Sequence, residues 1–94
     1  MPPQSATITI QNKTATPKAQ EVTPNGRIKF QNKDQNEYVL CLYKEGATCA
    51  TGTSIVLPSN NDFTIFIKPT DVFYYDLLDS SGATVVAAAG PIKN

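Results

Sequence analysis

The sequence predicts an all-β fold: an antiparallel two-sheet β-sandwich of about seven to eight short strands with Greek-key connections. Short stretches rich in β-branched and aromatic residues recur along the chain, separated by clusters of Pro, Gly, Asn, Asp and Ser. No stretch places apolar residues at helical spacing between capping residues. A length of 94 residues suits one domain, so we expect residues 1–94 to form a single sandwich, with 1–5 as a disordered N-terminus.

Strands in the first part of the chain are predicted from alternation and turn residues. Thr and Ile alternate over residues 6–11, which predicts a half-buried strand with its isoleucines inward. Residues 12–18 are polar and contain a proline, as in a connection or an edge. A short strand is expected at residues 19–23. The Pro24-Asn25-Gly26 sequence predicts a turn, because proline fixes one dihedral angle and Asn-Gly accepts left-handed ones. Alternation then resumes over residues 27–31.

The second half of the chain contains four further predicted strands, at residues 54–57, 63–67, 72–78 and 83–89. Turn residues bound each of them, and Asp79-Ser80-Ser81-Gly82 predicts a hairpin between the last two. An alanine run continues directly out of this hairpin, so a strand is favoured over a helix there. Residues 90–94 are expected to be a tail. The pattern leaves open in which sheet each of these strands lies.

Residues 37–49 contain the strongest strand signal and both cysteines. The apolar run Tyr38–Tyr43 predicts a strand that is apolar on both faces and lies centrally in its sheet. Cys49 follows Cys41 by eight residues, a spacing that lets a small loop close back onto the strand through a disulfide. On the loop-entropy model this bond contributes about 2–3 kcal/mol. The alternative is a pair of reduced cysteines.

The composition excludes most catalytic and metal chemistry. The chain contains no histidine, so it has neither a Ser-His-Asp or Cys-His arrangement nor a histidine-dependent zinc, copper or iron site. No glycine-rich phosphate loop is present. We therefore expect no enzyme activity, no catalytic residues, no metal site and no cofactor.

Carboxylates are the remaining candidates for chemistry. Asp71, Asp76 and Asp79 lie near one another in the sequence, and Asp34 and Glu37 flank a loop. Paired carboxylates hydrolyse glycosides in deep clefts, and calcium binds oxygen-rich loops. A small sandwich rarely has a deep cleft, and no spacing here matches a calcium-binding loop. We therefore interpret these residues as strand ends and turn caps.

The charge and the flanking sequences indicate a setting for the protein. A formal net charge of +0 gives no electrostatic reason to bind nucleic acid, and no apolar run approaches the about 20 residues of a membrane-spanning helix. The N-terminus lacks the basic start and apolar core of a signal peptide. Frequent Thr, Asn, Gln, Ser and Pro, low charge and two cysteines nevertheless favour a secreted, cell-surface or virion-associated protein. A cytoplasmic location is the alternative.

Aromatic residues are the candidates for a binding surface. Tyr38 or Tyr43, together with Phe66 and Tyr74, are expected on strand faces opposite the core-facing residues. Exposed together, they would form a patch for a protein partner or for stacking a sugar ring. Packed in the core or at an edge, they would be ordinary structural residues.

Residues 6–44 resemble the first half of a cupredoxin: an Ile-Thr-Ile strand, a Val-Thr-Pro-Asn-Gly turn, and Arg-Ile-Lys-Phe-Gln-Asn-Lys-Asp before an apolar strand. The resemblance implies the fold alone. Glu37 or Tyr38 stands where that family has its first copper-binding histidine, and Tyr75–Ala83 carries none of the Cys, His and Met of its closing loop. The stretch Val-Phe-Tyr-Tyr-Asp-Leu-Leu-Asp-Ser-Ser-Gly is equally similar to the late hairpin of immunoglobulin-like or fibronectin-type domains.

These observations predict a non-enzymatic recognition module that binds a protein or a glycan through exposed aromatics, loops or a sheet edge. The alternative is a structural protein, either a self-assembling subunit or a decoration subunit of a virion or cell surface. In that case the strand at residues 38–43 buries its second face against another copy of the chain, and the protein is a homo-oligomer.

Overall fold

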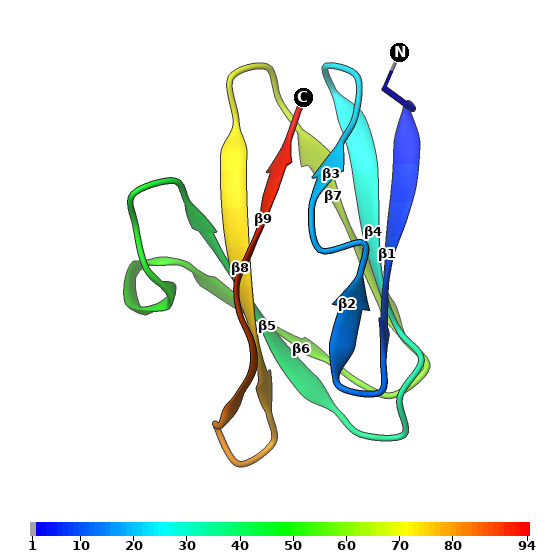
Figure 1. Cartoon of the computed structure of the whole chain (residues 1–94), viewed down its shortest axis with the longest axis vertical. Coiled ribbons are helices and arrows are strands. Elements are labelled where there is room, and N and C mark those ends of the chain that lie inside the picture. The colour runs from blue at the N-terminus through cyan, green and yellow to red at the C-terminus, as the bar shows by residue number, and fades with distance from the viewer. Residues whose placement is uncertain (1) are drawn as a thin grey trace.

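Two β-sheets pack face to face in the computed structural model, which describes residues 2–94 (Figure 1). The sheets have the strand orders β2-β1-β4-β7 and β3-β9-β8-β5-β6. In chain order the strands are β1 (Ser5–Gln11), β2 (Thr14–Thr16), β3 (Gln20–Glu21), β4 (Gly26–Asn32), β5 (Tyr38–Lys44), β6 (Thr53–Leu57), β7 (Asp62–Ile67), β8 (Val72–Asp79) and β9 (Thr84–Lys93). One turn of 3-10 helix, η1 (Cys49–Thr51), is the only helical element over this part of the chain. The predicted all-β sandwich is confirmed.

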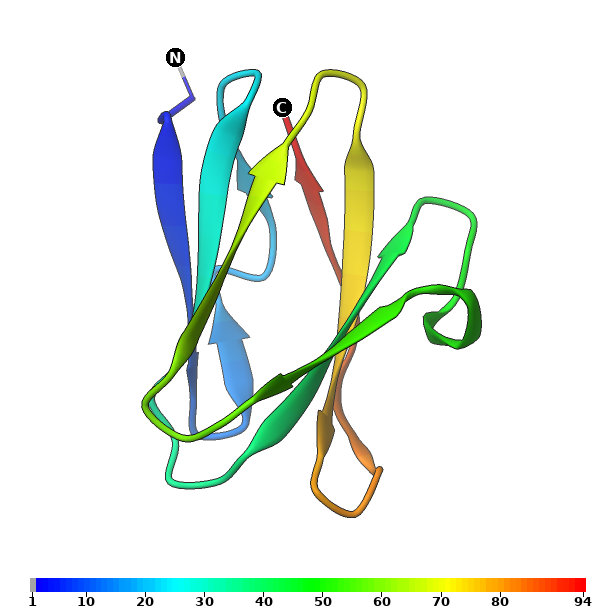
Figure 2. The ribbon, with the colours of Figure 1, turned by 180° about the vertical axis from the view of Figure 1, so that it is seen from behind.

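The two sheets are mixed, whereas antiparallel pairing throughout was predicted from the sequence. β1 runs parallel to β4, with Ile8 opposite Phe30, and β3 runs parallel to β9. After β1 the chain passes through β2 and crosses to β3 at the edge of the other sheet, so it re-enters at β4 in the direction of β1. β7 and β8 also lie in different sheets, joined by the turn at residues 68–71 (Figure 2).

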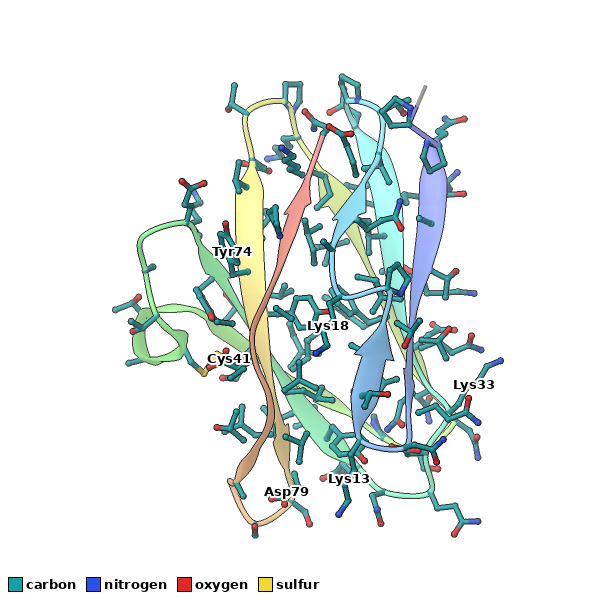
Figure 3. The ribbon with its side chains drawn as sticks, in the orientation of Figure 1. Lys13, Lys18, Lys33, Cys41, Tyr74 and Asp79 are labelled. Atoms are coloured by element: carbon teal, nitrogen blue, oxygen red, sulfur yellow. A yellow bond between two sulfur atoms is a disulfide. The ribbon has the colours of Figure 1, made fainter. Side chains whose placement is uncertain are left out.

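The core consists of inward-facing side chains from both sheets. Ile8 and Ile10 of β1 and Phe30 of β4 are fully buried, as the alternation predicted. Tyr75 of β8 meets Phe30 edge to face, with ring centroids 5.1 Å apart. The Tyr75 hydroxyl donates a 2.9 Å hydrogen bond to the carbonyl oxygen of Lys18, which lies in the β2–β3 connection (Figure 3). This aromatic pair therefore joins the two sheets to the segment that crosses between them.

The last strand extends into the segment that was expected to be a tail. β9 continues through Gly90 and Pro91 to Lys93, and Ile92 is fully buried. The backbone N–H of Val22 donates a 3.0 Å hydrogen bond to the carbonyl oxygen of Lys93. Gly-Pro normally interrupts a strand, but here β9 accommodates both residues through register shifts against β8 and a φ of 131° at Gly90.

The N-terminal segment also differs from the expectation of disorder over residues 1–5. Ser5 begins β1, and the carbonyl oxygen of Pro3 accepts a 2.9 Å hydrogen bond from the N–H of Thr23. The N–H of Arg27 donates a 2.9 Å hydrogen bond to the carbonyl oxygen of Gln4. Residues 3–5 are thus paired with the chain around the 24–26 turn, and Met1 lies outside the described residues.

Candidate functional site

The middle of the outer face of β5 is covered by the loop that follows this strand. Cys41 is fully buried and is disulfide-bonded to Cys49, with their Cα atoms 5.6 Å apart, as predicted from their spacing. The loop at residues 45–52 consequently folds over the middle of this face, on the side away from the four-stranded sheet (Figure 3). β5 lies between β8 and β6, in agreement with its doubly apolar sequence.

Tyr38 belongs to the core, so it is not part of an exposed binding surface. Its side chain is 1% exposed because residues 38, 40 and 42 of β5 point inward. Its hydroxyl donates a 2.6 Å hydrogen bond to Oδ2 of Asp34. Burial, followed by the contact with this carboxylate, raises the pKa of Tyr38 to about 12. An unbroken apolar run does not reveal which alternate set of residues faces the core, so the sequence could not place Tyr38.

Tyr43 and Tyr74 face outward from the five-stranded sheet, directly opposite each other on β5 and β8. Both are partly buried. The Tyr43 hydroxyl donates a 2.9 Å hydrogen bond to Oδ1 of Asp76, which also accepts the N–H of Ala88 at 2.7 Å. Asp76 therefore links Tyr43 of β5 to the bulged part of β9. Burial, together with the Asp76 carboxylate, raises the pKa of Tyr43.

Phe66 lies on the outer face of the other sheet and is 64% exposed. The predicted aromatic patch is therefore not assembled. Tyr38 is in the core, Tyr43 and Tyr74 are on one sheet, and Phe66 is on the opposite one.

A groove of about 530 Å³ opens between β7 and the strands β5 and β6. It lies on the side of the sandwich seen in Figure 2, opposite the β2–β3 connection seen in Figure 1. Its apolar lining is formed by Leu42, Ile55, Phe63, Ile65, Phe66 and Phe73. The rim is formed by Lys44, Thr53, Lys68 and Asp71.

The core is incompletely covered at this groove. Phe63 and Ile65 point inward from β7 but stay only partly buried, whereas Ile67 on the same face is fully buried. On the other wall Ile55 is partly buried and Leu57 is fully buried. The groove thus exposes side chains that would otherwise complete the hydrophobic core.

The groove exists because β6 and β7 diverge. These strands are consecutive in the chain, but β6 is an edge strand of the five-stranded sheet and β7 is an edge strand of the four-stranded sheet. Pro58 follows β6, and the turn is fixed by a 3.1 Å hydrogen bond from the N–H of Asn61 to the carbonyl oxygen of Pro58 and by a φ of 61° at Asn60. From this turn the two strands separate along their length (Figure 2).

β7 has a free hydrogen-bonding edge beside the groove. It pairs only with β4. The N–H of Asn32 donates a 2.9 Å hydrogen bond to the carbonyl oxygen of Asn61, which sets the alternation of the antiparallel ladder. Residues 63 and 65 therefore bond to β4. The backbone N–H and C=O groups that point away from the sheet belong to Asp62, Thr64 and Phe66.

The carboxylate of Asp34 organises a turn through three hydrogen bonds. It accepts hydrogen bonds from the N–H of Asn12 at 2.6 Å, the N–H of Lys13 at 3.0 Å, and the Tyr38 hydroxyl. Burial opposes ionisation of Asp34, but these hydrogen bonds outweigh it and lower the pKa below its usual value.

Asp79 caps the β8–β9 hairpin in the same way. Its Oδ1 accepts the Ser81 hydroxyl at 2.6 Å and the N–H of Ala83 at 3.0 Å, and these bonds lower its pKa. Asp71 accepts the N–H of Lys68 at 3.1 Å. Across residues 2–94, no three metal-ligating side chains gather into a site. Asp34, Asp71 and Asp79 are therefore turn caps engaged by the chain's own donors, whereas Asp76 accepts its hydrogen bonds from Tyr43 and Ala88 within the sheet.

The groove was not predicted from the sequence. Its signals were present: the Phe63-Thr64-Ile65-Phe66-Ile67 stretch carries apolar residues on both faces. This pattern indicates a site only once β6 and β7 are known to be edge strands of different sheets, which depends on long-range pairing.

A comparison of the chain with models of known protein families finds no match, and neither does a comparison with curated proteins. Within the described chain, no helix is long and apolar enough to span a bilayer. The function is therefore inferred from the geometry of the site.

Proposed function

We propose that this protein is a non-enzymatic recognition module that binds an extended segment of a partner protein along the edge of β7. The main support is that both faces of β7 line the same groove, Phe63 and Ile65 from the inner face and Phe66 from the outer face. A strand covered by a neighbour cannot present both faces to one groove. β7 therefore combines unpaired backbone groups with apolar surface on either side.

The edge of β7 also lacks the usual protection against pairing. Edge strands of soluble proteins are normally guarded by charged residues, prolines or bulges. Between Asp62 and Lys68, β7 contains neither a charge nor a proline, and its pairing with β4 is regular. Such an edge is prone to pair with another chain, which favours a specific partner.

A bound segment would extend the four-stranded sheet by one strand. Main-chain hydrogen bonds would supply affinity, and side chains at alternate positions would supply specificity. Successive side chains of the segment would point to opposite faces, one set entering the groove beside Ile65 and the other lying beside Phe66. The free edge spans residues 62–66, about 17 Å at 3.4 Å per residue, which suits a partner segment of about five to six residues.

Self-association is the second candidate, supported by a different surface. On the outer face of the five-stranded sheet Val39 is paired with Val56 and Leu78, and Val56 is 58% exposed. This apolar row would be the contact between copies of the chain. A glycan site has less support, because the outward aromatics lie on two different sheets and do not form one stacking platform.

We also propose that the protein acts outside the cytoplasm. The Cys41–Cys49 disulfide supports this location, because disulfides persist in oxidising compartments and are rare in the cytosol of mesophiles.

Hydrogen exchange tests strand addition directly. The probe is a soluble peptide of about ten residues in which valine and threonine alternate, mixed with the protein while amide exchange is followed by NMR. We expect slower exchange at the amides of Thr64 and Phe66, because an added strand would accept hydrogen bonds from them. T64P, which removes one donor at an exposed edge position, should abolish the effect.

A matched pair of variants locates the contact. F66S should weaken peptide binding, whereas V56S, a change of similar type at a similarly exposed position on β6, should leave it intact. Unchanged exchange at Thr64 and Phe66 with the peptide in excess would refute the proposal. Loss of a dimer in V56S, with no peptide effect at β7, would favour self-association instead.

A further inference from the structure

Basic side chains flank the edge of β7. Lys44 and Lys68 stand at the rim of the groove. On the outer face, Arg27 and Lys29 line a second hollow of about 320 Å³, to which Thr64 also contributes. The edge of β7 therefore borders two hollows, and each hollow is lined by a pair of cations.

This excess of positive charge is local. The whole chain carries eight basic and eight acidic side chains. Among the residues of β7 and those lining the two hollows, the four cations face two carboxylates, Asp62 and Asp71. Both carboxylates keep their charge, Asp71 while accepting the N–H of Lys68 and Asp62 at the first position of the free edge, so the cations exceed the carboxylates by two. The free edge is therefore positive in a neutral protein, which favours an anionic partner.

We infer that the partner segment is an acidic strand, in which apolar residues alternate with aspartate or glutamate. This inference rests on the proposed strand addition at β7. Lys29 is paired with Thr64, and Arg27 with Phe66. An added strand would lie two strand spacings from β4, about 9.6 Å. A lysine and a glutamate side chain together bridge that distance over the short side chain of Thr64, while the apolar residues enter the groove beside Ile65.

Three peptides of equal length test this inference. They share the same valines and carry glutamate, threonine or lysine at the intervening positions. We expect the glutamate peptide to bind tightest and the lysine peptide weakest, with a change in Kd of up to about 5-fold for each ion pair formed or lost. The order should collapse in 1 M NaCl, where the Debye length falls to about 3 Å.

Reversing a charge on the protein tests the same inference from the other side of the contact. K29E should weaken the glutamate peptide by about 5- to 30-fold and strengthen the lysine peptide. Lys29 lies on the outer face, so the fold is expected to tolerate the change. K18E is the matched control, because Lys18 lies in the β2–β3 connection on the opposite side of the sandwich (Figure 3), and it should change neither affinity.

The outcomes separate the inference from the proposed function. If all three peptides bind equally and each slows exchange at Thr64 and Phe66, the acidic partner is overturned and strand addition stands. If none of them protects these amides, both are overturned. If the protein alone sediments as a dimer and the amides of Thr64 and Phe66 are protected in that dimer, the strand that binds the edge of β7 belongs to a second copy of the chain. If the protein binds phosphatidylserine vesicles, K29E abolishes that binding, and the three peptides show no order of affinity, the anionic partner is a membrane surface and not an acidic strand.

Discussion

Breaking the Cys41–Cys49 disulfide should lower the stability of this sandwich by an amount that follows from its geometry. The bond closes a loop with a sequence separation of 8. On the loop-entropy model such a loop contributes about 2.5 kcal/mol at 25 °C. For a domain of this size, that loss lowers the melting temperature by about 10–20 °C. It should also lower the urea midpoint by about 1–2.5 M, for an m-value of about 1–2.5 kcal/mol/M.

Two forms of the protein separate the cross-link from side-chain packing. Reduced wild type keeps both sulfur atoms, so it loses the cross-link alone. C41A/C49A also removes a fully buried sulfur from the outer face of β5, which should cost about 1 kcal/mol more through the cavity that remains. Urea unfolding followed by far-UV circular dichroism, with and without reductant, measures both differences.

The disulfide prediction has a clear point of failure. If oxidised and reduced wild type unfold within about 0.5 kcal/mol of each other, the loop closed by the bond does not constrain the unfolded chain as the model requires. If both cysteines of the unfolded protein react with iodoacetamide without any reductant, the bond is absent.

Two further predictions concern the titratable pair at the turn. D34N should destabilise the protein by about 1–2 kcal/mol at pH 7, because a charged acceptor is lost, whereas E37Q, at an exposed position nearby, should have little effect. The folded pKa of Asp34 is depressed, so this stabilisation is present above the unfolded pKa and is lost as pH falls through the folded pKa; a D34N deficit that does not shrink once the pH is below the unfolded pKa would contradict it. The pKa of Tyr38 is raised from 10.0 to about 12, so stability should be full below pH 10 and fall as pH rises toward 12. An alkaline absorbance titration should therefore show a late phenolate that is missing in Y38F, and its appearance at pH 10 in native protein would contradict the buried placement.

Local chemistry determined those parts of the fold that could be predicted. The Thr-Ile alternation placed Ile8 and Ile10 in the core, and Pro-Asn-Gly formed the expected turn, with a φ of 64° at Asn25. The short cysteine spacing likewise predicted the disulfide. Each of these features depends on residues close together in sequence.

Features that depend on distant residues could not be predicted in this way. The parallel pairing of β1 with β4 and the location of β6 and β7 at the edges of different sheets are set by which surfaces bury each other. Tyr38 and Tyr43 are equally apolar in sequence, and only the register of β5 against β8 and β6 decides that Tyr38 points inward. The groove depends on both kinds of long-range information, so it became visible only in the assembled sandwich.

The pairing of β3 with β9 affects the order in which the strands can pair during folding. It joins Gln20 to Ile92, so a segment near the start of the chain is completed by one near its end. Val22 is fully buried in the finished fold, and its N–H bonds to the carbonyl oxygen of Lys93, so this bond cannot form until residue 93 has been made. Non-local strand pairings of this kind form slowly, on a scale of about milliseconds to seconds. The sandwich therefore closes only once residues 92–93 are available, and until then the stretch between Asp62 and Lys68, which carries neither a charge nor a proline, is exposed to pairing with other chains.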